Sequence, residues 1–283
     1  MNGTVRRVRR EPGRAMSREV LFRQAPRPYR TLAYGTHRDQ VVDLWPAPRD
    51  GAPLVLIVHG GFWRAEYDRR HVRPMANALA AAGYAVAAAE YRRTGTPGGG
   101  WPGTFDDIAA VADATAGLAA RLGADPRRQV WAGHSAGGHL ALWAASRHRL
   151  PQGSPWHAAR PEAAVLSLAG CASPTLAALW DLDEGAARAL LGGTPEGVPE
   201  RYAAADPGWL LPTGVRVTLV HGTADEQIPV AMSRTFTARA RRLGDPVSLI
   251  ELPGVEHFAL IDPRSAAWPE VLAALAGLAG PAR

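Results

Sequence analysis

The 283-residue sequence has one cysteine, no lysine and no apolar run long enough to span a membrane. The single cysteine, Cys171, excludes an intrachain disulfide and gives no support for a thiolate metal site, so we expect a small buried residue there. Residues 1–16 contain arginine pairs but lack the apolar core of a secretory signal. These absences favour a cytoplasmic protein with no membrane partner.

The positive charge of the chain is concentrated at its beginning. The formal net charge is +6, and residues 1–30 contain nine arginines and two acids, a balance of +7 that leaves the remaining chain at −1. We therefore expect residues 1–20 to be a disordered arginine-rich tail, with Met16 as an alternative start. A tail that binds a polyanion is the other interpretation, but the near-neutral remainder predicts no nucleic-acid partner.

Beyond this tail, apolar runs and helical patterns alternate along the chain. Two strands whose alternating pattern predicts an antiparallel pair are expected over 29–34 and 40–45. Further strands, several with the continuous apolar run of a strand buried on both faces, are expected over 54–58, 84–91, 130–132, 163–169, 215–220 and 247–251. Helices are expected over 71–82, 104–122, 229–243 and 264–278. This order predicts one α/β domain over residues 21–283, with a mostly parallel central sheet flanked by helices.

Residues 172–212 interrupt the alternation. Glycine and proline pairs separate three short helical pieces, expected over 175–180, 185–191 and 199–205. Because this stretch follows a predicted strand of the parallel sheet, we expect it to lie above the carboxyl edge of the sheet as a small helical cap.

The pentapeptide Gly133-His134-Ser135-Ala136-Gly137 fits the pattern G-x-S-x-G. A short apolar run precedes it and an alanine- and leucine-rich helical pattern follows, which is the strand–turn–helix context of a nucleophile elbow. In such a turn the central residue has a strained backbone, and the glycines avoid collisions with the neighbouring strand and helix. We expect Ser135 to be a nucleophile at the carboxyl edge of the sheet, and a glycine-rich turn with a surface serine is the alternative.

A serine hydroxyl needs a base within hydrogen-bond reach, and the base needs a carboxylate to orient it. Asp225 follows one predicted strand closely, and His257 lies on the loop after the last one. We therefore expect Asp225 and His257 to complete a catalytic triad with Ser135, and Glu226 is the alternative acid. Structural or surface positions are expected for the other histidines, which are His37, His59, His71, His134, His139, His148, His157 and His221.

The segment His59-Gly60-Gly61-Phe62-Trp63 follows the strand expected beside the elbow strand. Glycines let the main chain approach a substrate oxygen, and preorganised amides stabilise the negative charge of a tetrahedral intermediate. We expect the oxyanion-hole donors to be the amides of Gly61, Phe62 and Ala136, and an ordinary Gly-Gly turn is the alternative.

These motifs together resemble the α/β-hydrolase superfamily over about residues 40–280, including Glu90-Tyr91-Arg92 and the chain order serine, aspartate, histidine. The resemblance implies the α/β-hydrolase fold with a small helical cap insertion. The most similar branches are the hormone-sensitive-lipase-like esterases and the kynurenine formamidases. Where the first branch usually carries a third glycine, Phe62-Trp63 produce the His-Gly-Gly-x-Trp pattern typical of the second, which implies Gly61 and Phe62 as oxyanion donors.

Residues and resemblance together predict a serine hydrolase that cleaves a carboxylic ester or related acyl bond of a small-molecule substrate through an acyl-enzyme. No metal or organic cofactor is expected. An arylformamidase acting on an N-formylkynurenine-like amide is the first alternative. An acyl-transfer step in biosynthesis, or a catalytically silent hydrolase-fold protein, is the second. The oligomeric state stays open, with a homodimer as one option.

Aromatic residues in the predicted loops and cap would suit an aryl or acyl substrate. The residues expected to line the substrate pocket with Phe62 are Trp63, Trp101, Trp180 and Trp209. The alternative is that these rings pack the cap against the domain. Arg64 and Arg92 are candidates to meet a substrate carboxylate, with surface solvation or an internal ion pair as the alternative.

Overall fold

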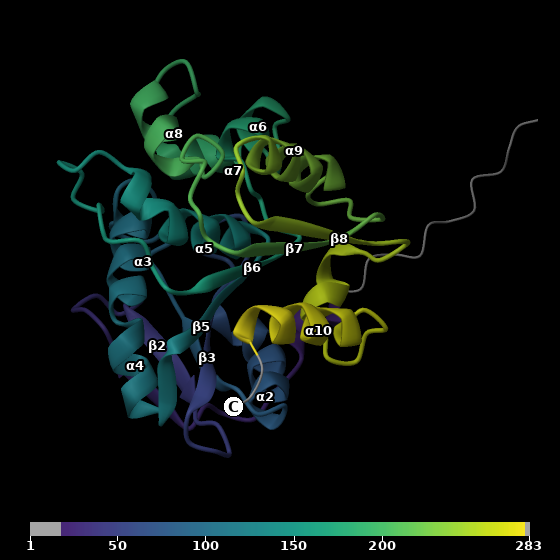
Figure 1. The fold of residues 1–283 in the computed structure, drawn as a ribbon. Coiled ribbons are helices and arrows are strands. Elements are labelled where there is room, and N and C mark those ends of the chain that lie inside the picture. Colours follow the sequence, from purple (N-terminus) through teal and green to yellow (C-terminus); the bar gives the residue numbers. More distant parts are fainter. Residues whose placement is uncertain (1–17, 281–283) are drawn as a thin grey trace, which may run out of the picture.

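The computed structural model describes residues 18–280, and within this range eight strands form one sheet in the order β1-β2-β4-β3-β5-β6-β7-β8 (Figure 1). The two strands at one edge join the sheet antiparallel, and every neighbouring pair from β4 to β8 is parallel. The strands are β1 (Arg30–Ala33), β2 (Val41–Trp45), β3 (Ala52–Val58), β4 (Ala85–Ala89), β5 (Ala124–His134), β6 (Ala164–Leu168), β7 (Val217–Gly222) and β8 (Val247–Leu252).

Helices cover both faces of this sheet because each central strand is apolar on both sides. Leu54 and Leu56 pack into one core cluster, while Val55 and Ile57 pack into the other. The first cluster also contains residues of α3 (Gly103–Asp113), α4 (Thr115–Arg121), α5 (Ala136–Ser146) and α9 (Val230–Arg242). The second contains residues of α1 (Glu19–Phe22), α2 (Arg73–Ala81) and α10 (Trp268–Ala279). The predicted α/β-hydrolase architecture is confirmed.

Two predicted elements have different lengths in the structure. The helix expected over 104–122 is divided at Ala114 into α3 and α4, where the Thr115 hydroxyl donates to the Ala112 carbonyl at 2.7 Å and competes with the helical backbone bonds. The strand expected over 130–132 is part of the longer β5, because its first residues also pair with β3 across a register shift. Short 3-10 turns complete the elements as η1 (Arg69–Val72), η2 (Arg147–Arg149) and η3 (His257–Ile261).

The three helices expected in the insertion are present as α6 (Pro174–Leu179), α7 (Ala186–Leu191) and α8 (Pro199–Ala205). Their apolar residues belong to the same core cluster as α3 and α5. The Trp143 indole of α5 donates to the Ala204 carbonyl at 2.9 Å, and the Trp101 amide donates to the Leu190 carbonyl at 2.8 Å. The insertion is therefore packed against one helical layer of the domain, at the end of the molecule where α6 and α8 lie in Figure 1.

The beginning of the described chain is part of the fold. Residues 1–17 of the expected tail lie outside the described residues, but α1 already starts at Glu19, and Val20 is buried in the core cluster beside α2 and α10. Ordered structure thus begins before the expected tail boundary at residue 20.

Cys171 is buried, and its burial raises the pKa of the thiol. Across residues 18–280, every helix is too short or too polar to cross a membrane.

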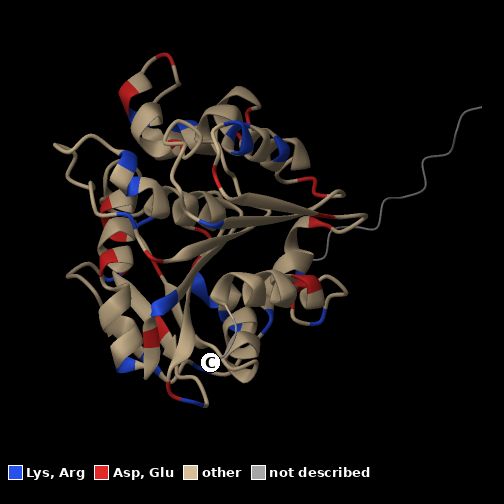
Figure 2. Cartoon of the chain, in the orientation of Figure 1, with Lys and Arg blue, Asp and Glu red and all other residues tan. Residues whose placement is uncertain are grey.

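The charge of the described residues is nearly balanced. Residues 18–280 contain 26 arginines and 25 acids, so most of the net charge of +6 falls on the ends of the chain. Figure 2 shows basic and acidic residues interspersed over the helices and loops of the domain.

Candidate active site

Ser135 stands at the turn between β5 and α5. Its backbone is left-handed, with φ 55° and ψ −122°, which is a strained conformation for a residue with a side chain. A Cβ atom on Gly137 would lie 2.0 Å from the Val58 carbonyl oxygen, so the turn can pack against β3 only with glycine at that position. This is the geometry of the predicted nucleophile elbow.

The side chain of His257, at the start of η3, reaches that of Asp225 after β7. Nδ1 of His257 lies 2.6 Å from Oδ2 of Asp225. The other carboxylate oxygen, Oδ1, accepts the backbone amides of Gln227 and Ile228, each at 2.8 Å. Burial would raise the pKa of Asp225, but hydrogen bonds from His221 and His257 lower it well below its ordinary value. An ionised and fixed Asp225 can hold the proton of His257 on Nδ1 and leave Nε2 as a base.

His221 and Glu226 flank this pair differently. His221 is fully buried, with Nε2 2.9 Å from the Ile228 carbonyl oxygen and Nδ1 2.7 Å from the Ser233 hydroxyl. It therefore supports the loop that carries Asp225. The alternative acid Glu226 is exposed and forms no ion pair with the described residues, whereas Asp225 contacts His257 directly.

A cavity of about 90 Å³ brings most of these groups together. It is lined by four residues expected at the site, Gly61, Phe62, Ser135 and His257, and also by Tyr67, His71, His134, Gln227 and Phe258. The described residues contain no hydrogen bond from the Ser135 hydroxyl to the His257 imidazole, although both groups line this cavity. Such bonds are often long in the absence of substrate and tighten when it binds.

The loop after β3 lies directly against the elbow. A Cβ atom on Gly60 would lie 2.9 Å from the Ser135 Cβ and 2.8 Å from the His134 carbonyl oxygen. Gly61 and Phe62 both have positive φ, 110° and 48°, and their amides donate no hydrogen bond within the described residues. The Ala136 amide is at the first position of α5, where backbone N–H groups have no intrahelical acceptor. These three amides therefore have no acceptor among the described residues, and they belong to the loop and the turn that pack against each other beside Ser135.

A buried histidine–glutamate pair supports this loop. His59 is fully buried, with Nε2 2.7 Å from the Glu90 carboxylate and Nδ1 2.8 Å from the Gly60 carbonyl oxygen. Burial raises the pKa of Glu90, but His59 and Arg93 outweigh that effect and lower it to about 2. The Tyr91 hydroxyl donates to the His59 carbonyl at 3.0 Å. The sequence alone assigns Glu90 no role in the site. A carboxylate at the end of a predicted buried strand is the feature from which such a role could be inferred.

None of the four tryptophans expected in the pocket lines the cavity formed by the described residues. Trp63 is buried and donates from Nε1 to Nδ1 of His139 at 3.2 Å, and the Trp101 ring packs against Phe105 and Trp156. Trp180 and Trp209 are exposed. Trp63 and Trp101 match the alternative of packing, Trp180 and Trp209 match neither expectation, and Phe62, Tyr67 and Phe258 supply the aromatic wall instead.

The two arginines considered for a substrate carboxylate are already paired. Arg64 contacts Asp183 of the insertion at 2.6 Å, and Arg92 contacts Asp107 at 2.7 Å. Arg18 and Leu21, by contrast, line the cavity although the sequence pattern places Arg18 in the tail. An arginine-rich stretch without an apolar pattern gives no sign that one of its members reaches the site.

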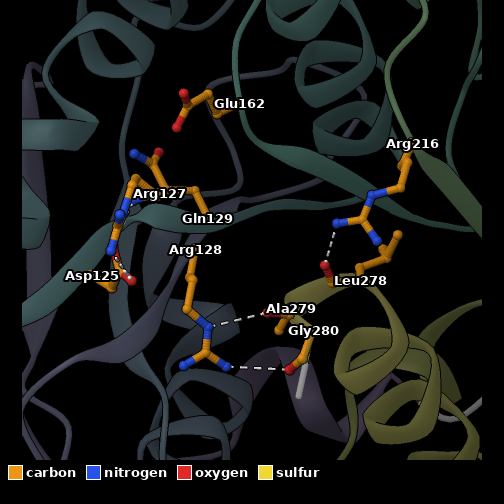
Figure 3. Close-up of a pocket in the computed structure, with 9 residues that line it drawn as sticks. All are labelled: Asp125, Arg127, Arg128, Gln129, Glu162, Arg216, Leu278, Ala279 and Gly280. Atoms are coloured by element: carbon orange, nitrogen blue, oxygen red, sulfur yellow. Dashed lines mark hydrogen bonds and ion pairs between the residues drawn. The ribbon is translucent and has the colours of Figure 1, made fainter. Parts of the chain in front are cut away.

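A larger cavity, of about 380 Å³, lies near the start of β5 and the end of α10 (Figure 3). Arg216 donates to the Leu278 carbonyl at 2.8 Å, and Arg128 donates to the Gly280 carbonyl at 3.2 Å. Cations at these positions stabilise the carbonyl end of α10. Since Ser135 follows the other end of β5, this cavity is remote from the elbow.

Comparison with known proteins gives relatives of a consistent kind. Esterase LipC of Mycobacterium tuberculosis (strain ATCC 25618 / H37Rv) is 31% identical over 254 residues, which cover 82% of this chain and 60% of LipC. Esterase LipQ of the same organism is 27% identical over 234 residues, which cover 78% of this chain and 54% of LipQ. The chain thus spans little more than half the length of these relatives.

Solved structures share the fold at lower identity. The esterase Est2 of Thermogutta terrifontis, bound to propionate, has a TM-score of 0.68 at 22% identity and covers 86% of this chain and 90% of its own. A truncated carbohydrate esterase from gut microbiota has a TM-score of 0.69 at 18% identity and covers 80% of this chain and 87% of its own.

The BD-FAE family profile matches residues 43–239, well over half of the sequence. The chain therefore belongs to the BD-FAE family, with an α/β-hydrolase fold.

Proposed function

We propose that this protein hydrolyses carboxylic esters of small acyl groups by serine catalysis. The observation that carries the proposal is the Asp225–His257 contact of 2.6 Å beside a strained elbow serine that lines the same cavity. The esterase names of LipC and LipQ support the reaction class.

In the proposed mechanism, Nε2 of His257 takes the proton of the Ser135 hydroxyl as the oxygen attacks the ester carbonyl. Asp225 keeps the other ring nitrogen protonated and stabilises the imidazolium that forms. The amides of Gly61, Phe62 and Ala136 would hold the oxyanion. His257 then protonates the leaving alcohol, and a water activated by the same imidazole hydrolyses the acyl-enzyme.

The size of the cavity supports a small acyl group. Its volume of about 90 Å³ has little room for a long chain beside the serine. Est2, which shares the fold, was solved with the small acid propionate. Formamide hydrolysis is the second candidate, because the loop His59-Gly60-Gly61-Phe62-Trp63 has the His-Gly-Gly-x-Trp pattern typical of kynurenine formamidases. The relatives named above are esterases and lend this second candidate no support.

The test compares p-nitrophenyl acetate with N-formylkynurenine, using the full chain and the variants Ser135→Ala and Ser248→Ala. Ser248 is an exposed residue of β8 and serves as the matched control. We expect ester turnover that Ser135→Ala abolishes and Ser248→Ala preserves, with labelling by a fluorophosphonate that depends on Ser135 alone. Faster turnover of the formamide would favour the second candidate. Failure of Ser135 to react with the fluorophosphonate would refute serine catalysis.

A further inference from the structure

The cavity beside Ser135 has one cationic wall. Among the charged residues lining it, Asp183 is neutralised by Arg64, whose Nε lies 2.6 Å from its carboxylate. The buried His71 is neutral at pH 7, because burial and the neighbouring His59 lower its pKa to about 3. Arg18 is exposed and forms no ion pair with any residue of the range 18–280. It therefore gives the cavity a positive charge that no described residue compensates with an ion pair.

The helix that follows Arg18 is fixed to the domain on two sides. Val20 is 1% exposed and packs into the core cluster beside α2 and α10. Arg23, directly after α1, forms a bidentate ion pair with Asp262, one arm of which measures 2.8 Å. The Leu21 amide donates to the Arg18 carbonyl at 3.0 Å. Arg18 thus projects from an anchored turn, and its backbone is held at the mouth of the cavity.

The position of Arg18 also indicates which part of a substrate it would meet. Its guanidinium lies 5.9 Å from the ring centre of Phe258, and that ring is 5.0 Å from the ring of His257. Because His257 protonates the leaving oxygen in the proposed mechanism, the leaving alcohol lies on the His257 side of the serine. The amides of Gly61 and Phe62, which would hold the acyl carbonyl oxygen, belong to the loop after β3, whereas Arg18 lies against Phe258, the residue directly after His257. Arg18 is therefore placed to meet the alcohol rather than the acyl group.

We propose that Arg18 is a specificity residue that binds an anionic group on the alcohol portion of a small-acyl ester. The inference rests on the proposed ester hydrolysis and adds a substrate class to it. A carboxylate and a phosphate offer the same chemistry, because the planar guanidinium pairs with either through two parallel hydrogen bonds. An uncharged alcohol would form no comparable ion pair with Arg18, and the other groups around the cavity offer it none.

The experiment uses three acetyl esters that differ in the group para to the ester oxygen. They are 4-acetoxybenzoate, 4-acetoxyphenyl phosphate and the neutral 4-acetoxybenzamide, which matches the benzoate in size. For the full chain we expect kcat/KM to be about tenfold higher for at least one anionic ester than for the amide. The gain should appear mainly in KM and shrink as ionic strength rises. The two anionic esters distinguish a carboxylate from a phosphate substrate.

Three variants separate the role of Arg18 from a general effect of charge. Arg18→Gln should bring the ratio of anionic to neutral ester close to one, because kcat/KM falls for the anionic esters, and Arg18→Lys should keep part of the preference. Arg27→Gln removes the same charge from an exposed residue of the same segment that does not line the cavity, and should keep the full preference.

A wild-type ratio near one, or an equal ratio in wild type and Arg18→Gln, would overturn the inference while ester hydrolysis by Ser135 stands. An equal loss in Arg18→Gln and Arg27→Gln would also overturn it, since the preference would then come from the net charge of the segment. If no ester were hydrolysed and Ser135 did not react with a fluorophosphonate, the proposed function and the inference would fail together.

Discussion

Nδ1 of His257 and Oδ2 of Asp225 lie 2.6 Å apart although 32 positions separate the residues in the chain. The ends of two neighbouring parallel strands, β7 and β8, bring them together. Two backbone amides fix the second oxygen of the carboxylate, so it can hold only one imidazole orientation. The pair therefore behaves as one unit in the proposed reaction.

The first prediction concerns this carboxylate. Asp225→Asn should lower kcat for p-nitrophenyl acetate by about a thousandfold or more, because an amide favours the wrong tautomer of His257 while keeping the shape of the site. Glu226→Gln, which changes the exposed neighbour in the same way, should leave kcat near the wild-type value. Steady-state kinetics of the two variants tests this, and the reverse order of effects would identify Glu226 as the acid.

The fold and the proximity of Ser135, Asp225 and His257 could be predicted because their signals are local. Apolar runs of strand length alternate with helical patterns, and Ser135, Asp225 and His257 each stand just after a strand in a turn rich in glycine or proline. In a parallel sheet the carboxyl ends of the strands meet at one edge, so position along the chain is enough to bring such residues together.

The wall of the cavity could not be predicted, because it depends on contacts between distant segments. Arg18 reaches the site only because Val20 is buried and Arg23 pairs with Asp262, at the other end of the chain. Trp63 is of a residue type that often lines pockets, yet its indole faces His139 in the core. Whether an aromatic ring faces a cavity or a neighbouring helix depends on tertiary packing, which a single sequence does not contain.

The close approach of the oxyanion loop to the elbow gives a second prediction. Gly60→Ala would place a methyl group within 3 Å of the Ser135 Cβ and the His134 carbonyl oxygen, so loop and elbow must move apart. We expect kcat to fall by about a hundredfold, as when an oxyanion donor is lost.

Gly117→Ala is the control for this variant, because a Cβ atom at that position on α4 meets nothing within 4 Å. It should keep full activity and stabilise the protein by about 0.5–1 kcal/mol, since glycine is costly inside a helix. Activity of Gly60→Ala at the wild-type level would show that the loop contact is not needed for catalysis.

The buried carboxylate of Asp43 on β2 gives a third prediction. It is fully buried and contacts Arg73 at 2.7 Å, Arg69 at 3.1 Å and the Thr31 hydroxyl at 2.6 Å. Asp43→Ala should lower the free energy of unfolding by about 3 kcal/mol, because the half-buried guanidinium of Arg73 loses its partner and that of Arg69 keeps only Glu90, at 3.6 Å. Glu251→Ala removes the partner of Arg234 in an exposed pair and should leave the free energy of unfolding nearly unchanged. Urea unfolding of both variants tests the contrast.

The last prediction concerns stability in acid and the buried His139 of α5. Its Nε2 lies 2.8 Å from the Ala205 carbonyl oxygen and its Nδ1 accepts the Trp63 indole, so a second proton would face another N–H group. Burial lowers the pKa of His139 from 6.5 to about 4, and the unfolded chain therefore binds the proton first. Stability is retained above pH 6.5 and is lost as the pH falls toward 4, by about 2 kcal/mol at pH 5 relative to pH 8.

Burial also lowers the pKa of His71 and His134, so the pH dependence of the wild type alone does not isolate His139. His139→Gln does, because glutamine can accept from Trp63 and donate to Ala205 but does not titrate. Its unfolding free energy in urea should fall by about 2 kcal/mol less than that of the wild type between pH 8 and pH 5. An equal fall in both proteins would mean that His139 binds its second proton as readily in the folded protein as in the unfolded chain, which its two hydrogen bonds oppose.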